Sequence, residues 1–259
     1  MDVIYRILSI IIAIIVFIVI IIIWGWYGES YNLIEWWNRR IKSECDEQDK
    51  HSINGIPSYY NAWDCPNKTA IEFHRLIKLN HDDILEEVME VIKNKEEGGN
   101  MEDDENELFK EEKKWNPIWV RIMGEWSNES DKLPTLKRII SLFPEIPIVH
   151  ISVFYPGITV VESKNKSRAF HKYHYGLRIP YGDVGLKISG FDVKWKEKEG
   201  FIWDDTLIHS AWNHTCEPRI VIFADIFREL SGINSIGSKA VYTILKQNTI
   251  KKEKKRIIF

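Results

Sequence analysis

Between residues 148 and 227 the chain is cut into short β-prone stretches by Pro, Gly and Asp, which limits its possible folds more than any other feature. Several short strands of this kind, separated by turn residues, are typical of an all-β barrel or sandwich. The predicted strands are 148–155, 159–161, 169–179, 184–188, 191–195, 201–204 and 220–227. We therefore expect a mainly β domain.

The segment before these strands predicts helices. Residues 70–79 and 81–95 read as two helices, and the second begins with Asp82 and Asp83, which suit the first turn of a helix. A densely charged stretch over 96–114 follows and reads as a surface loop, and residues 136–143 predict a further short helix. We expect these helices to flank the β domain.

The first residues of the chain are strongly apolar. Residues 7–26 contain Ser9 as their one clear polar residue, and a helix of this length spans about 30 Å, the thickness of the hydrocarbon layer. Trp24, Trp26 and Tyr27 end the run as an interfacial aromatic belt would. No Ala-x-Ala-like cleavage site follows. The segment therefore predicts an uncleaved N-terminal transmembrane helix rather than a signal peptide.

Composition sets wider bounds. A chain of 259 residues and 30.6 kDa suits one globular domain with an appendage. Its net charge of −3 gives no reason to expect nucleic-acid binding, and the short basic stretch over 251–256 reads as a solvated tail. Two alternatives remain for the cysteines: a Cys45–Cys65 disulfide, or three free thiols that include Cys216.

Three polar residues in the β segment need an explanation before any resemblance is considered. His174 and His209 lie on different predicted strands or strand ends, so only folding can bring them together. Arg219 begins a very apolar strand, where an unpaired charge would be costly. Its partner is either an Asp or Glu of the chain or a small dicarboxylate, which guanidinium binds in a bidentate way.

The order of motifs in this segment resembles the aspartyl/asparaginyl β-hydroxylase family over residues 64–229. The matching pieces are Ser152 with Pro156-Gly157, Lys172-Tyr173-His174-Tyr175-Gly176-Leu177, Trp195 with Gly200, Asp204-Asp205-Thr206 through His209, and Arg219. Lys172 stands where the family has Arg, and the spacing from Trp195 to Gly200 is two residues longer. The resemblance implies a double-stranded β-helix of the jelly-roll or cupin-like kind, with Fe(II) and 2-oxoglutarate as cofactors.

The resemblance also implies roles for individual residues. His209 would be an iron ligand, and Arg219 would pair with the distal carboxylate of 2-oxoglutarate. The other residues expected around 2-oxoglutarate are Ser152, Lys172, His174 and, upstream, Trp115. Residues 172 and 174 share one face of a strand, so His171 would point to the other face and is a poor metal ligand.

One family position departs from the pattern. The first iron His should stand six residues after Gly157, where this chain has Ser163. Serine is a weak ligand for ferrous iron, and many non-haem iron oxygenases use two His and one carboxylate. Glu162 would supply a replacement ligand if the loop shifted by one residue. Two hypotheses follow, a working oxygenase or a non-catalytic binding module that keeps the barrel.

The expected organisation is a transmembrane anchor over 1–27, a juxtamembrane segment over 28–68 that packs irregularly, a β domain over 69–230 and a basic tail over 231–259. The enzyme for which the family is named is a type II protein of the endoplasmic reticulum. By resemblance we expect a single-pass membrane protein with a lumenal domain, with which four glycosylation sequons are compatible. The sequons begin at Asn67, Asn128, Asn165 and Asn213. The substrate class expected is a protein, peptide or lipid-linked molecule.

Overall fold

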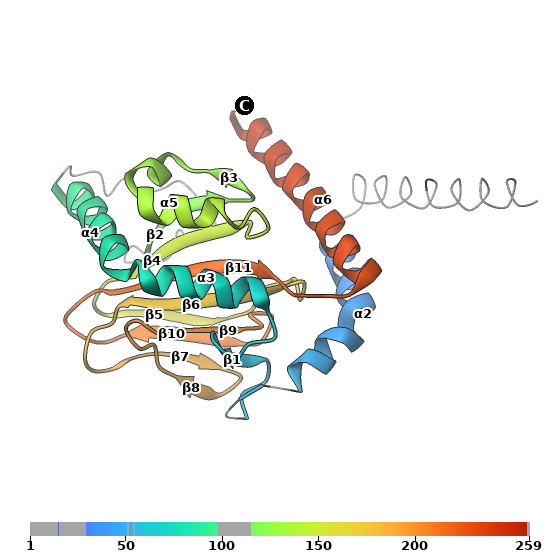
Figure 1. Ribbon diagram of the computed structural model, residues 1–259, viewed down its shortest axis with the longest axis horizontal. Coiled ribbons are helices and arrows are strands. Elements are labelled where there is room, and N and C mark those ends of the chain that lie inside the picture. The colour runs from blue at the N-terminus through green and yellow to red at the C-terminus, as the bar shows by residue number, and fades with distance from the viewer. Residues whose placement is uncertain (1–14, 16–29, 51, 54, 98–114, 258–259) are drawn as a thin grey trace, which may run out of the picture. The chain divides into compact units, whose positions relative to one another are not determined.

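The computed structural model describes residue 15 and residues 30–50, 52–53, 55–97 and 115–257 (Figure 1). The chain divides into two compact units, one of residues 43–229 and one of residues 1–42 with 230–259. Each unit is described by itself below. The boundaries expected from the sequence, at 27, 68 and 230, stay predictions.

The larger unit is built on two antiparallel sheets (Figure 1). The first has the order β1-β9-β6-β11-β4-β2-β3 and the second β5-β10-β7-β8. Their strands are β1 (Tyr59–Asn61), β2 (Trp115–Ile122), β3 (Glu125–Trp126), β4 (Ile148–Phe154), β5 (Ile158–Ser163), β6 (Phe170–Arg178), β7 (Val184–Ile188), β8 (Phe191–Val193), β9 (Gly200–Trp203), β10 (His209–Asn213) and β11 (Arg219–Phe227). From β4 onward the chain passes back and forth between the sheets, which is the connectivity of a double-stranded β-helix. The mainly β architecture expected from the sequence is therefore present.

Helices cover the outer face of the seven-stranded sheet in Figure 1. They are α3 (Lys68–Leu79), α4 (His81–Glu97), α5 (Pro134–Ser141) and the short 3₁₀ helix η2 (Asn128–Lys132). Phe73 of α3, Ile84 of α4 and Leu136 of α5 pack with outward residues of the strands, such as Tyr173, in one buried cluster. A second cluster, which includes Trp195, Trp203 and Leu186, fills the interior that the smaller sheet also lines. This second cluster surrounds the residues that the sequence assigned to a site.

The smaller unit contains the start of α2 (Ser30–Asp49) and helix α6 (Gly232–Ile257). Irregular packing was expected in the first of these segments, but Leu33, Trp37 and Ile41 recur every four residues and are all buried. The Trp37 indole donates a hydrogen bond to Ser238 Oγ at 2.8 Å. A side chain at Gly237 would collide with the same ring, 1.9 Å from a ring carbon, so α6 needs glycine there. The expected solvated tail is thus a helix over most of its length.

A buried network of charges joins the end of α2 to the β strands of the larger unit. Arg228, whose side chain is fully buried, contacts Asp49 at 2.9 Å and Asp204 at 2.8 Å. Arg168 contacts the same two carboxylates, at 2.8 and 3.2 Å, and also Asp46 at 2.9 Å. Because buried charges are tolerated only when paired, each member of this network depends on the others.

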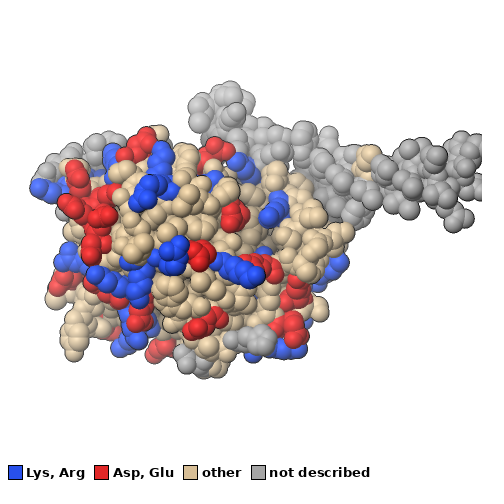
Figure 2. Space-filling view, in the orientation of Figure 1, with Lys and Arg blue, Asp and Glu red and all other residues tan. Residues whose placement is uncertain are grey.

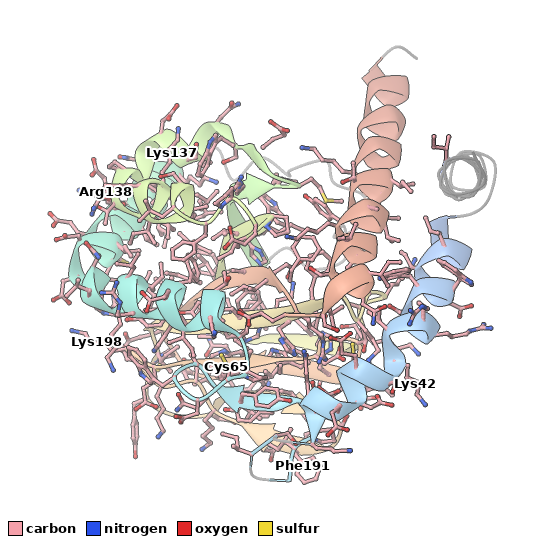
Figure 3. All side chains as sticks on the ribbon, turned by 45° about the vertical axis from the view of Figure 1, so that its right-hand side comes forward. Lys42, Cys65, Lys137, Arg138, Phe191 and Lys198 are labelled. Atoms are coloured by element: carbon pink, nitrogen blue, oxygen red, sulfur yellow. The ribbon has the colours of Figure 1, made fainter. Side chains whose placement is uncertain are left out.

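The three cysteines are free thiols. Burial raises the pKa of both Cys45 and Cys65 to about 11, so neither thiol is reactive at neutral pH. Figure 3 shows Cys65 beside the start of α3, inside the fold. The disulfide alternative from the sequence is therefore not the one present.

Two of the four sequons are closed to modification in this fold. The Asn213 amide is fully buried and donates to the Phe154 and Glu217 carbonyls, both at 2.9 Å. Asn67 caps α3 by accepting from the Ala70 amide and donates to the Phe227 carbonyl at 2.7 Å. Both side chains are structural, so these two sequons give no support to a glycosylated domain.

The expected membrane anchor requires a correction. Residues 1–27 lie, apart from Ile15, outside the part of the chain that the structure describes. Among the described helices, none combines the length and apolar character needed to cross a membrane. This finding corrects both the transmembrane helix expected in the fold and the single-pass localisation expected from it.

Acidic and basic side chains are intermixed on the face of the larger unit shown in Figure 2. Neither sign dominates that face, and Lys198 with Asp82 (3.0 Å) and Lys137 with Asp131 (2.5 Å) are examples of exposed pairs on this unit. The expectation that the chain does not bind nucleic acid stays a prediction.

Candidate active site

The inner face of the larger sheet carries a row of aromatic and imidazole rings. His174 of β6, Phe223 of β11, His150 of β4 and Trp119 of β2 are direct cross-strand neighbours. The His174 and Phe223 rings stack at 4.0 Å between centroids, and His150 meets Phe223 edge-on at 5.0 Å. Because side chains alternate along a strand, Ser152 and Arg219 face the same interior as this row.

Arg219 is fully buried at the start of β11. Its Nη2 donates to Ser152 Oγ at 2.6 Å, and its guanidinium lies 3.9 Å from the Phe154 ring centroid and 4.5 Å from that of Trp195. The aromatic faces hold the guanidinium plane by cation–π contact. Ser152 and the rings therefore fix the direction in which the remaining N–H groups can act.

The guanidinium has no counter-ion within the described part of the chain. Arg219 Nε and Nη1 are buried and make no hydrogen bond there, and no carboxylate pairs with them. Burial lowers the pKa of Arg219 to about 9. Of the two partners considered from the sequence, the internal Asp or Glu is thus absent from these residues, and a carboxylate-bearing ligand would satisfy the group.

His174 is engaged at both ring nitrogens. The Trp195 indole N–H points to Nδ1 at 3.2 Å, and the Trp203 indole N–H points to Nε2 at 3.3 Å. Burial and the positive charges of Lys172 and Arg219 keep the pKa of His174 well below its usual value, so the ring is neutral. A neutral imidazole accepts at only one nitrogen, so one indole donor lacks an acceptor.

Lys172 was expected to face 2-oxoglutarate, but two carboxylates hold it. It pairs with Asp225, its cross-strand neighbour, and with Asp205 at 3.3 Å. Burial lowers the pKa of Lys172, but the two carboxylates together raise it above its ordinary value. Lys172 is thus a charged member of an internal cluster rather than a group waiting for a ligand.

His209 begins β10 directly opposite Ser163 of β5. Its Nδ1 lies 2.8 Å from the Leu207 carbonyl, which can only accept, so Nδ1 carries the proton. In the neutral ring, Nε2 then carries the lone pair, and it lies 3.3 Å from Ser163 Oγ. This is how a metal-binding imidazole is oriented, with the second nitrogen fixed by a carbonyl.

Ser163, which stands where the family has its first iron His, is therefore the residue that faces His209. Glu162 is exposed, and the register between β5 and β10 shifts just before Ser163, so the residue that pairs with His209 is Ser163 and not Glu162. Within the described ranges, no three His, Cys, Asp or Glu side chains gather as a metal site would. One imidazole and one hydroxyl do not fit an iron centre, and we assign no reaction step to iron.

Trp115 begins β2 opposite Phe154, which in turn pairs with Arg219 across β4 and β11. This register places its backbone in the row of the candidate cosubstrate pocket. Its side chain lies outside what the structure describes. The expected role of Trp115 thus stays a prediction.

Sequence reasoning missed His150, Asp225 and Trp203. His150 precedes Ser152 by two residues, so the alternation that placed Lys172 and His174 on one face would also have placed His150 beside Ser152. No local signal marked Asp225 as the partner of Lys172, because that pairing depends on strand register.

Four of the five buried histidines among the described residues predict a loss of stability in mild acid. Burial lowers the pKa of His74 to about 4, and it lowers those of His150, His171 and His174 well below 6.5. Below pH 6.5 the unfolded chain takes up protons that the native state refuses, so stability falls as pH falls. Each such group contributes about 1.4 kcal/mol per pH unit.

Urea unfolding between pH 7.5 and 5.5 would measure this effect. We expect a constant free energy of unfolding above pH 7 and a decline of several kcal/mol by pH 5.5. His171, which packs edge-on against Tyr60, provides the control. His171→Phe removes one titrating group, so its free energy of unfolding should depend less steeply on pH, by about 1.4 kcal/mol per pH unit. A free energy independent of pH over this range would contradict the neutral, buried state of these rings.

The sequence was compared with known protein families and proteins. A family model described as aspartyl/asparaginyl beta-hydroxylase matches residues 78–229, more than half of the chain. The ornithine lipid ester-linked acyl 2-hydroxylase of Rhizobium tropici is 25% identical over 120 residues. That match covers 45% of this chain and 43% of the relative, so this chain spans less than half of the relative's length.

Solved structures resemble the chain only weakly. A 2OG-Fe(II) oxygenase family oxidoreductase from Burkholderia pseudomallei has a TM-score of 0.33 at 10% identity, over 47% of this chain and 70% of its own. A cupin domain of a transcriptional regulator from Enterobacter cloacae has a TM-score of 0.28 at 15% identity, over 32% and 82%. Likeness at this level adds nothing to the strand order and contacts described above.

Proposed function

The chain belongs to the aspartyl/asparaginyl β-hydroxylase family, and from that premise we propose that it is a 2-oxoglutarate-dependent hydroxylase whose cosubstrate binds at Arg219. The observation that carries the proposal is a fully buried guanidinium with two unsatisfied N–H groups and no carboxylate partner among the described residues. Such a group costs stability unless a ligand pairs with it. A fork of N–H donors matches a carboxylate in geometry and charge.

The surroundings of Arg219 suit a dicarboxylate. Ser152 orients the guanidinium, Phe154 and Trp195 sandwich it, and one of the two indole N–H groups at His174 lacks an acceptor. The groups around Arg219 thus offer donors that lack acceptors, as a binding site for a small dianion should. The substrate that is hydroxylated would be a protein side chain, a peptide or a lipid-linked molecule, and the relative named as an acyl 2-hydroxylase supports the last of these.

A second candidate function is favoured by one observation. Ser163 faces His209 at the position where the family places an iron ligand, and the strand register pairs His209 with Ser163 rather than with Glu162. A chain that binds 2-oxoglutarate but holds no iron would be a non-catalytic module that responds to the dicarboxylate. Both candidates share the Arg219 pocket and differ only at His209.

One titration series separates the two candidates. Metal-free protein would first be titrated with 2-oxoglutarate by calorimetry, and saturable binding is expected under both. Anaerobic Fe(II) would then be added, and the visible band of a chelated iron–2-oxoglutarate complex would be recorded beside succinate formation in air. A band lost in His209→Ala supports the hydroxylase, and binding without a band supports the module. Failure of the metal-free protein to bind 2-oxoglutarate would refute both.

A further inference from the structure

Asp183, His214 and Thr159 form a hydrogen-bonded row on the outer face of the smaller sheet. Asp183 Oδ2 lies 2.9 Å from His214 Nδ1, and His214 Nε2 lies 2.9 Å from Thr159 Oγ1. Thr159 belongs to β5, Asp183 precedes β7 and His214 follows β10, so three separate segments of the chain supply the row. These strands are neighbours in the sheet, with β10 in the middle (Figure 1).

The row lies on the opposite face of this sheet from the candidate active site. Thr159 is the direct cross-strand partner of Trp212, so these two side chains share a face. Strand β10 pairs with β7 without a register shift, so His209, three positions before Trp212, faces the other side. His209 accordingly meets the buried Trp203 ring at 4.8 Å. The row is therefore separate from the groups proposed to bind 2-oxoglutarate.

The protons of the row are placed by its acceptors. Hydrogen bonds from His214 and from the Trp212 indole lower the pKa of Asp183, so the carboxylate is ionised. An ionised carboxylate only accepts, so His214 Nδ1 carries a proton and donates it. When the ring is neutral, Nε2 accepts, and the Thr159 hydroxyl is its donor. A hydroxyl whose proton is aimed at a neutral imidazole is oriented as a nucleophile with its general base.

Trp212 holds the carboxylate of the row in position. Its indole N–H donates to Asp183 Oδ1 at 2.6 Å, and the His214 backbone N–H donates to the Asp183 carbonyl at 2.8 Å. The Trp212 ring packs against Gly185, where an added Cβ would come within 2.6 Å of a ring carbon. Glycine at 185 thus leaves room for the ring that fixes Asp183. The group that orients the imidazole is itself held from two sides, as a preorganised site requires.

We propose that Asp183, His214 and Thr159 form a catalytic centre, separate from the candidate active site, that hydrolyses small esters. Thr159 Oγ1 bonds to the ester carbonyl carbon as its proton passes to His214 Nε2. The bond from that carbon to the leaving oxygen then breaks, and the leaving oxygen takes the bonding electrons and the proton from Nε2. Water attacks the acyl-threonine in the same way, which releases a carboxylic acid and restores the Thr159 hydroxyl. Asp183 stays ionised throughout and stabilises the imidazolium that forms in each step.

The surroundings of the row limit the esters that it can hydrolyse. The side chains of His214 and Asp183 are 47% and 67% exposed, and Thr159 is exposed as well. Water weakens the electrostatic stabilisation of the transition state, so only esters with good leaving groups should react. The half-buried Trp212 ring, beside Thr159 across the strands, offers an apolar surface for an aryl leaving group or a short acyl chain.

Hydrolysis of p-nitrophenyl acetate by the full metal-free chain tests the proposal. We expect release of p-nitrophenol to fall at least about 10-fold in Thr159→Ala and in His214→Gln. Thr159→Ser keeps a hydroxyl and should keep most of the rate. Peptide mass spectrometry of an acid-quenched reaction should find the acetyl group on Thr159. Thr243→Ala is the matched control and should react as the unchanged chain does, because exposed Thr243 donates to the Lys239 carbonyl and not to a histidine.

A variant of the third residue tests the row as a unit. Asp183→Asn keeps the size of the side chain but allows the wrong tautomer of His214, so it too should lower the rate. Equal rates in Thr159→Ala and the unchanged chain would overturn the proposal. A loss in His214→Gln without a loss in Thr159→Ala would make His214 the nucleophile and would also overturn it. An acetyl group found on lysines but not on Thr159 would overturn it even if a variant failed to fold.

Discussion

Ser163→His should add a second imidazole ligand beside His209 and so strengthen metal binding there. The new imidazole would face His209 across β5 and β10, where the two residues are direct cross-strand partners and Ser163 Oγ already lies 3.3 Å from Nε2. We expect affinity for Fe(II) or Co(II) to rise by at least about 100-fold, because even loss of a partner outside the ligand set changes metal affinity 10- to 100-fold. The visible spectrum of the Co(II) protein, titrated anaerobically, would measure the gain.

A matched control is available one residue away. Glu162 is exposed and is not the cross-strand partner of His209, so Glu162→His should add an imidazole without adding a ligand. Equal gains in the two variants would show nonspecific binding by surface histidine. No gain in Ser163→His, in a protein that keeps its β-rich circular dichroism, would show that strand register alone does not define the metal position.

Arg219→Met should have opposite effects on ligand binding and on stability. The variant loses the guanidinium proposed to pair with one carboxylate of the diacid, so we expect 2-oxoglutarate affinity to fall by more than about 100-fold. Without ligand, the variant should be more stable than the unchanged chain. Burial lowers the Arg219 pKa from its ordinary value to about 9, which corresponds to a cost of at most roughly 5 kcal/mol.

The direction of this stability change follows from protonation. Arginine in the unfolded chain keeps its proton well above pH 9, whereas buried Arg219 keeps its proton only below about pH 9. The full cost is therefore present at every pH below 9, and Arg219→Met should stabilise the protein equally at pH 6.5 and 8. Urea unfolding at the two pH values measures it. An unchanged or lower free energy of unfolding in Arg219→Met would mean that the guanidinium has a partner after all.

Two further variants test whether a loss of affinity in Arg219→Met is specific to the guanidinium at this position. Arg219→Lys keeps the charge but not the planar fork, so it should bind the diacid with intermediate affinity. Arg178, half-exposed on β6 and 3.4 Å from Glu217, serves as the control, and Arg178→Met should leave diacid affinity unchanged. A similar loss in Arg178→Met would point to general electrostatic attraction rather than to the Arg219 pocket.

The sequence predicted the β architecture and several positions within it because those features repeat locally. Counting six residues from Gly157 placed Ser163 at the metal position, and the register shows it opposite His209. Alternation placed Lys172 and His174 on one face, and Tyr173 in the outer core. Turn residues and two-residue periodicity depend on near neighbours, which a single sequence displays.

What the sequence left out depends on contacts between distant strands. Lys172 was expected to contact 2-oxoglutarate, but it forms an ion pair with Asp225, its cross-strand neighbour. Strand β10 at the centre of the smaller sheet was not predicted, because His209–Asn213 is short, polar and mostly half-buried. The orphaned state of His150 and Arg219 is likewise visible only when every described neighbour is known.

The ionic network at the end of α2 has a consequence for dissecting the protein into fragments. Asp46 and Asp49 come from the chain before residue 69, and they pair with Arg168 and the fully buried Arg228. A recombinant fragment cut at the motif boundary, residues 69–230, would remove Asp46 and Asp49 from this network and leave Asp204 of its three carboxylates for Arg168 and the buried Arg228. Such a fragment would misfold for an electrostatic reason even though every family motif is present, so the shortest autonomous unit begins before Asp46.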